Sequence, residues 1–127
     1  MRFKDKCALV TGAAGGIGAS VVEHLRREGA RVAAADINVD AVDADALLPG
    51  DLLNPAYADN LAKAARDSLG ALDIVINNAG VITRGCVTET TDPDWDLSVG
   101  VNVEAPFRIC RTAIPLMAES GGGAIVN

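Results

Sequence analysis

Aromatic residues are scarce in this chain of 127 residues, which contains only four of them: Phe3, Tyr57, Trp95 and Phe107. Half of the residues are nevertheless hydrophobic, so alanine, valine and leucine carry the apolar content. Small and branched aliphatic side chains are typical of strands that helices bury on both faces. We therefore expect an α/β protein, in which Trp95 and Phe107 are core or subunit-contact residues rather than stacking partners for a substrate.

Cysteine and histidine are also rare, which limits the chemistry available to the chain. The cysteines Cys7, Cys86 and Cys110 are odd in number and far apart, so they indicate neither a disulfide framework nor a metal site. We expect them to be small buried apolar residues of a protein in a reducing compartment. The single histidine, His24, falls on the outer or side face of a predicted helix, which argues against a Ser-His-Asp triad.

The chain lacks an excess of basic residues and lacks any long hydrophobic run. Its formal net charge of −6 argues against a nucleic-acid partner, because phosphate backbones bind to basic surfaces. One bound dinucleotide is compatible with this charge, since local N–H groups can hold a single pyrophosphate. The apolar run after Lys6 stops at Gly12, too short for a signal peptide or a membrane span, so we expect a soluble cytoplasmic protein.

The order of the predicted elements indicates one domain of ordinary size. Strands are expected at 7–10, 31–36, 72–77 and from 124 onward, and helices at 16–28, 55–69 and 92–119. The stretch 37–49 is ambiguous, because a short helix and a short strand barely fit into it. Alternating strands and helices predict a doubly wound parallel sheet, a Rossmann fold, with strand order 3-2-1-4-5 and a nucleotide between strands 1 and 4.

The last predicted helix carries several interruptions. We expect Asp92 as its N-cap, a break near Gly100, and a bend or an early end caused by Pro106 and Pro115. In its second part, apolar residues repeat at three- and four-residue spacing: Val103, Phe107, Cys110, Ile114 and Met117. In the first helix, an apolar face is expected from Ile17, Val21, Val22 and Leu25.

A glycine-rich turn at residues 12–18 joins the first strand to the first helix. The N–H groups of such a turn and the positive end of the helix dipole together make a site for phosphate. Packing alone is the alternative explanation for Gly12, Gly16 and Gly18.

The second predicted strand ends in Asp36, 18 residues after Gly18, where a carboxylate can accept a hydrogen bond from the ribose 2′-hydroxyl. The same carboxylate repels a 2′-phosphate, and no arginine or lysine occurs at Ile37 or inside the turn. These features favour NAD(H) over NADP(H). Arg31 is a counter-signal, but we expect it at the opposite end of the sheet. A solvated acid at a strand end is the alternative for Asp36.

Four landmarks occur in order along the chain: Thr11-Gly12-x-x-x-Gly16-x-Gly18, Asp51 after the third strand, Asn77-Asn78-Ala79-Gly80 after the fourth strand, and Asn102 in the long helix. This ordered set resembles the short-chain dehydrogenase/reductase family. Residues 122–127 look like the fifth strand of that family.

The resemblance implies a role for each of these residues. Asp51 would contact the adenine amino group with Leu52 alongside, and Asn102 would be a catalytic residue that holds a water of the proton relay. The implied cofactor-binding residues are Gly12, Ala14, Gly15, Gly16, Ile17, Gly18, Asp36, Asp51, Leu52, Asn78, Ala79 and Gly80. The alternatives are that Asp51 is only a turn residue, that Asn78 chiefly ties strands together, and that Asn102 is a polar residue within the helix whose side chain bonds to a carbonyl.

The catalytic serine and the Tyr-x-x-x-Lys pair of the family cannot be placed in this sequence. The only tyrosine, Tyr57, is followed four positions later by Leu61. The chain therefore resembles the N-terminal half of the family, truncated after about the fifth strand, with the catalytic C-terminal half absent. We expect this polypeptide alone to be inactive.

The resemblance implies an NAD(H)-dependent oxidoreductase that transfers a hydride between nicotinamide and a secondary alcohol or ketone. Residues 81–86 are the part of this chain expected to touch the substrate. A homodimer or homotetramer through the long helix is also implied, with the stripe from Val103 to Met117 as its interface. Two alternatives stay open: a non-catalytic nucleotide-binding or oligomerisation module, and an NADP(H)-dependent 3-oxoacyl-carrier-protein-type reductase, which Asp36 disfavours.

Overall fold

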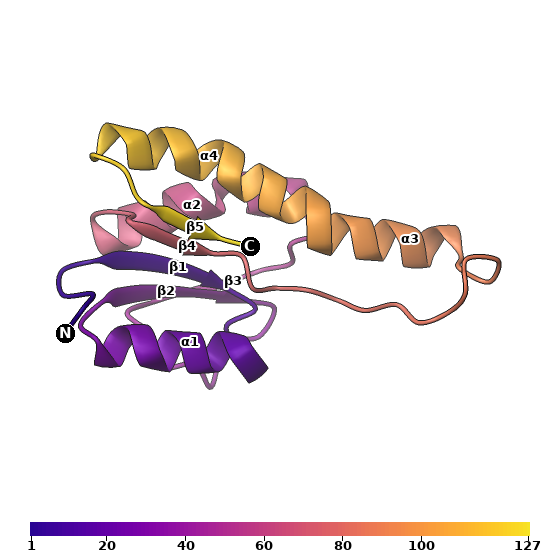
Figure 1. Ribbon diagram of the computed structural model, residues 1–127, viewed down its shortest axis with the longest axis horizontal. Coiled ribbons are helices and arrows are strands. Elements are labelled where there is room, and N and C mark those ends of the chain that lie inside the picture. The colour runs from indigo at the N-terminus through magenta and orange to yellow at the C-terminus, as the bar shows by residue number, and fades with distance from the viewer.

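The sheet of this protein has five parallel strands, as the computed structural model of residues 1–127 shows (Figure 1). The strands are β1 (Cys7–Thr11), β2 (Arg31–Asp36), β3 (Ala46–Pro49), β4 (Ile74–Ile76) and β5 (Ala124–Val126). Their order is β3-β2-β1-β4-β5, and every neighbouring pair is parallel. This order confirms the predicted doubly wound α/β fold, in which the winding direction changes between β1 and β4.

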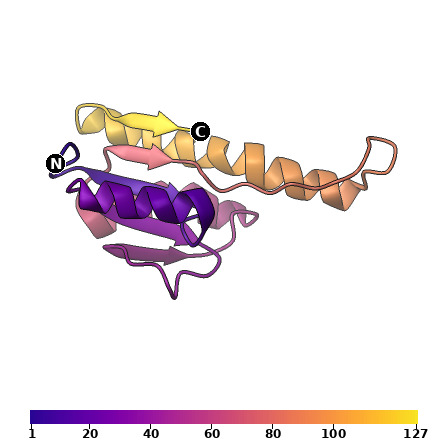
Figure 2. The same cartoon turned by 60° about the horizontal axis from the view of Figure 1, so that its bottom comes forward.

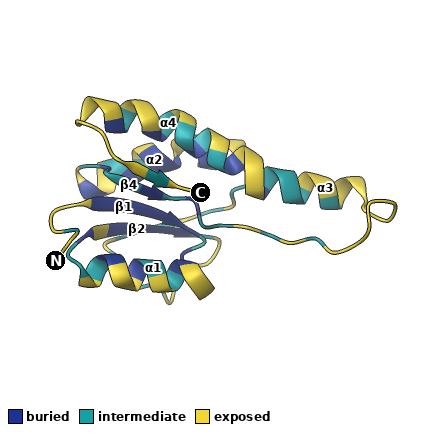
Figure 3. Ribbon diagram, in the orientation of Figure 1, coloured by how far each residue is buried: buried dark blue, intermediate teal, exposed yellow.

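Helices cover both faces of the sheet (Figures 1 and 2). One face is covered by α1 (Gly16–Arg27), and the other by α2 (Pro55–Leu69) and α4 (Ala105–Glu119), which pack together. Because side chains alternate along a strand, Leu9 packs into the cluster with α2 and α4, whereas Val10 packs into the cluster with α1. The central strands are consequently buried along nearly their whole length (Figure 3).

The ambiguous stretch after β2 contains no helix. Residues 37–45 form turns and irregular chain, and β3 follows directly. Asp45 fixes this connection to β2, because its N–H donates to the Val32 carbonyl at 2.9 Å and its carboxylate accepts from the Val32 N–H at 2.8 Å. The short crossover places the end of β3 beside the end of β2, next to the site described below.

The ends of α2 match the sequence prediction. The Asn54 side chain accepts a hydrogen bond from the Ala56 N–H at 3.0 Å, and Pro55 occupies the first turn. Gly70 ends the helix with a φ of +88°, a left-handed conformation that glycine adopts without strain.

The helical segment after β4 differs from its prediction in two ways. Helix α3 (Asp92–Val99) is capped by Thr91 and not by Asp92, because the Thr91 hydroxyl accepts a hydrogen bond from the Asp94 N–H at 3.3 Å. The expected break is a π-helical segment, η1 (Gly100–Glu104), which leads without interruption into α4. Figure 1 shows α3, η1 and α4 as one long rod that extends past the sheet.

The two prolines of the rod do not end it. Pro106 lies where η1 passes into α4, and the rod continues through it although proline has no N–H to donate. Pro115 lies inside α4 on its exposed side, where water can bond to the carbonyl that has lost its partner.

Most of the predicted apolar stripe, which begins at Val103 in η1 and continues along α4 to Met117, faces solvent rather than the core. Val103, Phe107 and Ile114 are 61%, 58% and 57% exposed, and only Met117 of the stripe is buried. The residues of α4 that pack inside follow a four-residue spacing: Ala105, Ile109, Ala113 and Met117. Trp95 is exposed as well, so of the two roles expected for Trp95 and Phe107, core or subunit contact, the core is wrong and the subunit contact stays a prediction.

Two smaller expectations about burial are also wrong. Ile17 is exposed, because the buried position one turn before Val22 is taken by Gly18. Cys7 is buried as expected, but Cys86 is exposed and Cys110 is only partly buried. None of the helices combines the length and the apolar character that a membrane span needs.

Candidate functional site

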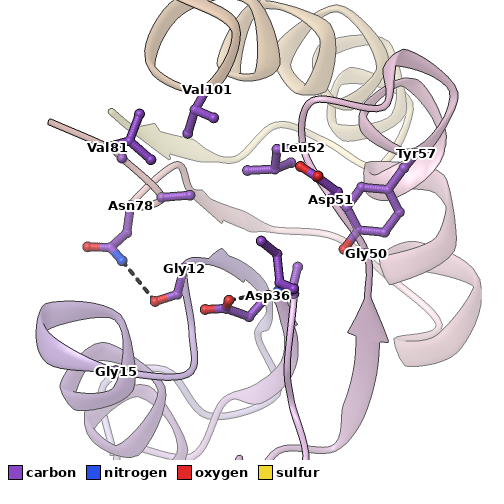
Figure 4. Close-up of a pocket in the computed structure, with 14 residues that line it drawn as sticks. Gly12, Gly15, Asp36, Gly50, Asp51, Leu52, Tyr57, Asn78, Val81 and Val101 are labelled. Atoms are coloured by element: carbon purple, nitrogen blue, oxygen red, sulfur yellow. Dashed lines mark hydrogen bonds between the residues drawn. The ribbon is translucent and has the colours of Figure 1, made fainter. Parts of the chain in front are cut away.

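A cavity of about 390 Å³ opens at the carboxyl ends of the strands (Figure 4). Its walls come from residues that end or follow β1, β2, β3 and β4, and from η1. Eight of the twelve predicted cofactor-binding residues line it: Gly12, Gly15, Asp36, Asp51, Leu52, Asn78, Ala79 and Gly80. The other four, Ala14, Gly16, Ile17 and Gly18, belong to the glycine turn and the start of α1 without lining the cavity, and Asn102 does not line it either.

Close packing holds the glycine turn against the chain after β4. A Cβ atom at Gly18 would overlap the Gly12 carbonyl oxygen and lie 2.6 Å from the Asn78 Nδ2 atom. Gly12 has a φ of +62°, and a Cβ atom there would lie 2.9 Å from the Cα atom of Ala79. The packing explanation is therefore true of Gly12 and Gly18, and it does not conflict with a role of the turn in binding.

The start of α1 is open to an anion. Its N-cap, Gly15, offers no side chain, the first turn carries no acidic residue, and a Cβ atom at Gly15 or Gly16 would meet nothing within 4 Å. The first N–H groups of a helix lack intrahelical partners, and the helix dipole adds positive potential at the same place. A phosphate group can therefore approach this backbone closely.

The carboxylate of Asp36 lies at the cavity and is fixed by the backbone. Its Oδ2 atom accepts a hydrogen bond from the Ala14 N–H at 2.9 Å, and its Oδ1 atom accepts one from the Ile37 N–H at 2.7 Å. Each oxygen retains a lone pair, so the carboxylate can accept two further hydrogen bonds from a ligand. No lysine, arginine or histidine lines the cavity, and Arg31 donates to the Leu69 carbonyl at the opposite end of the sheet.

Asn78 connects the end of β4 to the end of β1. Its Nδ2 atom donates to the carbonyls of Thr11 at 3.1 Å and Gly12 at 3.2 Å. The Ala79 N–H donates to the Thr11 hydroxyl at 3.1 Å, which adds a second link. The side chain of Asn78 thus ties the two strands together, and this tie places Ala79 and Gly80 in the cavity wall.

Asn102 lies in the π-helical segment and holds the chain that follows the Asn-Asn-Ala-Gly motif. Its Oδ1 atom accepts from the Val81 N–H at 2.9 Å, and its Nδ2 atom donates to the Val81 carbonyl at 2.8 Å. The side chain therefore bonds to a carbonyl, as the alternative for this residue expected, and that carbonyl lies outside the helical segment of Asn102. Val81 and Val101 both line the cavity, so Asn102 stands directly beside its wall.

Tyr57 also lines the cavity, which the sequence interpretation missed. Its hydroxyl donates to the Leu48 carbonyl, and its ring packs against Gly50. Burial, together with the negative charge of Asp36, raises the pKa of Tyr57 to about 12. The sequence could have indicated this position, because Tyr57 lies three residues after the N-cap Asn54, in the first turn of the helix that follows β3.

The protein combines a doubly wound parallel sheet, a cavity at the carboxyl ends of the strands, and a glycine turn without a side-chain cap. This combination is typical of dinucleotide-binding proteins. The family model for short chain dehydrogenase matches residues 6–127. The chain therefore belongs to the short-chain dehydrogenase family.

Similar proteins come from several bacteria. The chain is 36% identical to D-threitol dehydrogenase of Mycolicibacterium smegmatis and 35% identical to an uncharacterized oxidoreductase of Thermotoga maritima, over 99% and 100% of its own length. It covers 53% and 54% of those relatives, about half of each. A short chain dehydrogenase from Burkholderia cenocepacia, solved in complex with NADP, superposes with a TM-score of 0.86 at 30% identity, over 91% of this chain and 52% of that one.

Proposed function

We propose that this chain binds NAD(H) as part of a short-chain oxidoreductase, which transfers a hydride between nicotinamide and a secondary alcohol or ketone. The observation that supports NAD(H) is the Asp36 carboxylate at the cavity, with no cation among the lining residues. Ribose hydroxyls can donate hydrogen bonds to this carboxylate. A 2′-phosphate beside it would be repelled and would find no counter-charge.

The other parts of the cofactor have matching surroundings in the cavity, whose volume lies in the ordinary range for a ligand site. In our proposal the pyrophosphate lies at the glycine turn and the start of α1, with residues 12 and 14–18. Asp51 and Leu52 border the adenine, and residues 78–80 border the riboses and the nicotinamide. The bound cofactor supplies or accepts the hydride, and the residues of this chain hold and orient it.

We propose that Asn102 has a catalytic role, in which it holds a water molecule of the proton relay. We also propose that residues 81–86 contact the small-molecule substrate. Tyr57 is unsuited to donate the proton, because its pKa is about 12 and its hydroxyl is bonded to the Leu48 carbonyl. We therefore propose that residues 1–127 alone bind cofactor without catalysing hydride transfer. The exposed apolar stripe of η1 and α4 supports assembly of the protein into a homodimer or homotetramer.

Calorimetric titration with NADH and NADPH tests the cofactor assignment. We expect the wild-type chain to bind NADH more tightly than NADPH. Asp36→Ala should weaken NADH binding about tenfold, the change expected when hydrogen bonds to a charged group are lost, and should reduce the preference for NADH. Asp40→Ala is the matched control, because it removes the same charge from an exposed position outside the cavity.

Two results would contradict the assignment. Tighter binding of NADPH than of NADH by the wild-type chain would overturn the choice of cofactor. An equal loss of NADH affinity in the Asp36 and Asp40 variants would show that overall charge, rather than the position of the carboxylate, determines binding.

A further inference from the structure

Tyr57, the only tyrosine of the chain, is held in a fixed position at the cavity, near the carboxyl end of β3. Tyr57 lies in the first turn of α2, so its main chain is anchored by that helix. Its hydroxyl donates to the Leu48 carbonyl at the other end of the ring. A half-buried ring fixed at both ends gives a rigid wall, and its hydroxyl is not free to serve as a ligand group.

Glycine at position 50 allows the ring to occupy this place. A Cβ atom at Gly50 would overlap the Cδ2 and Cε2 atoms of Tyr57. The Gly50 N–H donates to the Asp36 carbonyl at 3.0 Å, which brings the ring, Gly50 and the end of β2 into one continuous surface. Figure 4 shows Tyr57 beside Gly50 and Asp51, on the side of the cavity away from the glycine turn.

The surroundings of the ring suit a flat base that carries an amino group. Ile37 and Leu52 add apolar surface to the same cavity, and the carboxylate of Asp51 can accept a hydrogen bond from an exocyclic amino group. Aromatic side chains contribute strongly to the binding of nucleic-acid bases through contact with the face or edge of the ring.

We propose that the Tyr57 ring is the wall against which the adenine base of the cofactor packs, and that it contributes to the binding of the adenosine half. This inference rests on the proposed function, because it takes a dinucleotide as the ligand. The contact is made by ring carbons, and the hydroxyl acts only through its hydrogen bond to the Leu48 carbonyl, which holds the ring in place.

Two substitutions separate the ring from the hydroxyl. Tyr57→Phe keeps the ring, and Tyr57→Leu keeps apolar bulk without it. Calorimetry with NADH, AMP and reduced nicotinamide mononucleotide shows which half of the cofactor is affected. We expect Tyr57→Leu to weaken NADH and AMP about tenfold, as loss of a base–aromatic contact implies, and to leave the mononucleotide unchanged. Tyr57→Phe keeps the ring and loses only the hydroxyl bond to the Leu48 carbonyl, so its affinity for NADH and AMP should stay closer to that of the wild type than the affinity of Tyr57→Leu does.

A second measurement does not depend on the folding of a variant. Since Tyr57 is the only tyrosine, 3-fluorotyrosine reports by fluorine NMR on this position of the wild-type cavity alone. AMP should shift its fluorine signal, and reduced nicotinamide mononucleotide should not.

The possible results distinguish this inference from the proposed function. If the wild type binds NADH while Tyr57→Leu binds NADH and AMP equally well, the inference is overturned and the function stands. An equal loss for all three ligands would also overturn it, because the ring would then only support the fold. If the wild type binds AMP but neither NADH nor NADPH, the proposed function fails and the base site stands; if it binds none of them, both fail.

Discussion

At the scale of single residues, Gly15 and Gly18 belong to the same turn and differ in what surrounds them. An added Cβ atom would overlap the Gly12 carbonyl oxygen at Gly18 and would meet nothing within 4 Å at Gly15, where φ is −160°. We expect Gly18→Ala to lower the free energy of unfolding by about 1–3 kcal/mol, as overpacking does. Gly15→Ala should change it by less than about 0.5 kcal/mol. Urea denaturation measures both, and equal losses would contradict the packing argument.

The residues of the site were predictable to different degrees. Asp36 and Asn78 could be placed from the sequence, because each ends or follows a strand and parallel strands bring these ends together. The ring of Tyr57 could not be placed from the sequence. Its position depends on a side-chain conformation and on the lack of a Cβ atom at Gly50, where the ring packs. The partner of Asn102 was equally hidden, since no pattern in the sequence links it to Val81.

At the scale of elements, Asp59 of α2 fastens that helix to α4. Its carboxylate accepts hydrogen bonds from Arg111 at 2.8 Å and Arg108 at 3.0 Å, and its carbonyl accepts one from the Thr112 hydroxyl at 2.9 Å. The Arg111 hydrogen bond, followed by that of Arg108, holds the pKa of the Asp59 carboxyl below its ordinary value of 3.8. The folded state therefore favours the ionised carboxylate.

This lowered pKa gives a pH dependence with a definite sign. The hydrogen bonds of the ionised Asp59 carboxylate stabilise the folded state fully above the unfolded pKa of about 3.8. This stabilisation is lost as the pH falls through the lower pKa of the folded state. We expect Asp59→Asn to be less stable than the wild type near pH 7, with a difference that shrinks below about pH 3.8. Urea unfolding across this pH range measures it. Asp40→Asn, at a position without an ion pair, is the control, and a difference independent of pH would refute the explanation.

The elements show what a hydrophobic pattern can predict. The bounds predicted for α2 are correct, because Pro55 and Gly70 constrain the backbone directly at its two ends. Periodicity predicted an apolar face on α4, but the face that packs against the protein includes the small residues Ala105 and Ala113. Alanine contributes little to a hydrophobic pattern, so this face was not predicted. The stretch before β3 was ambiguous because hydrogen bonds to β2, rather than any periodicity, determine its path.

At the scale of the whole molecule, the strand order was predictable because few topologies satisfy the rules for parallel sheets. Right-handed crossovers and a first turn rich in glycine leave one common arrangement, which the structure confirms. The long rod of α3, η1 and α4 was less predictable, since its continuity through Gly100 depends on a π-helical segment. Its outer surface carries an exposed apolar stripe that packing within the chain leaves uncovered.

Assembly through this stripe is the prediction for the whole molecule. Val103, Phe107 and Ile114 are each more than half exposed on the rod, and association removes such apolar surface from water. Phe107→Glu places a charge at the centre of the stripe, where burial without a partner is costly. We expect the wild type to sediment as a dimer or a larger assembly and the variant to dissociate. Ser68→Glu on α2 adds the same charge at an exposed position and should leave the assembly intact. A wild-type chain that stays monomeric at high concentration, or a Ser68 variant that dissociates equally, would show that this stripe does not determine assembly.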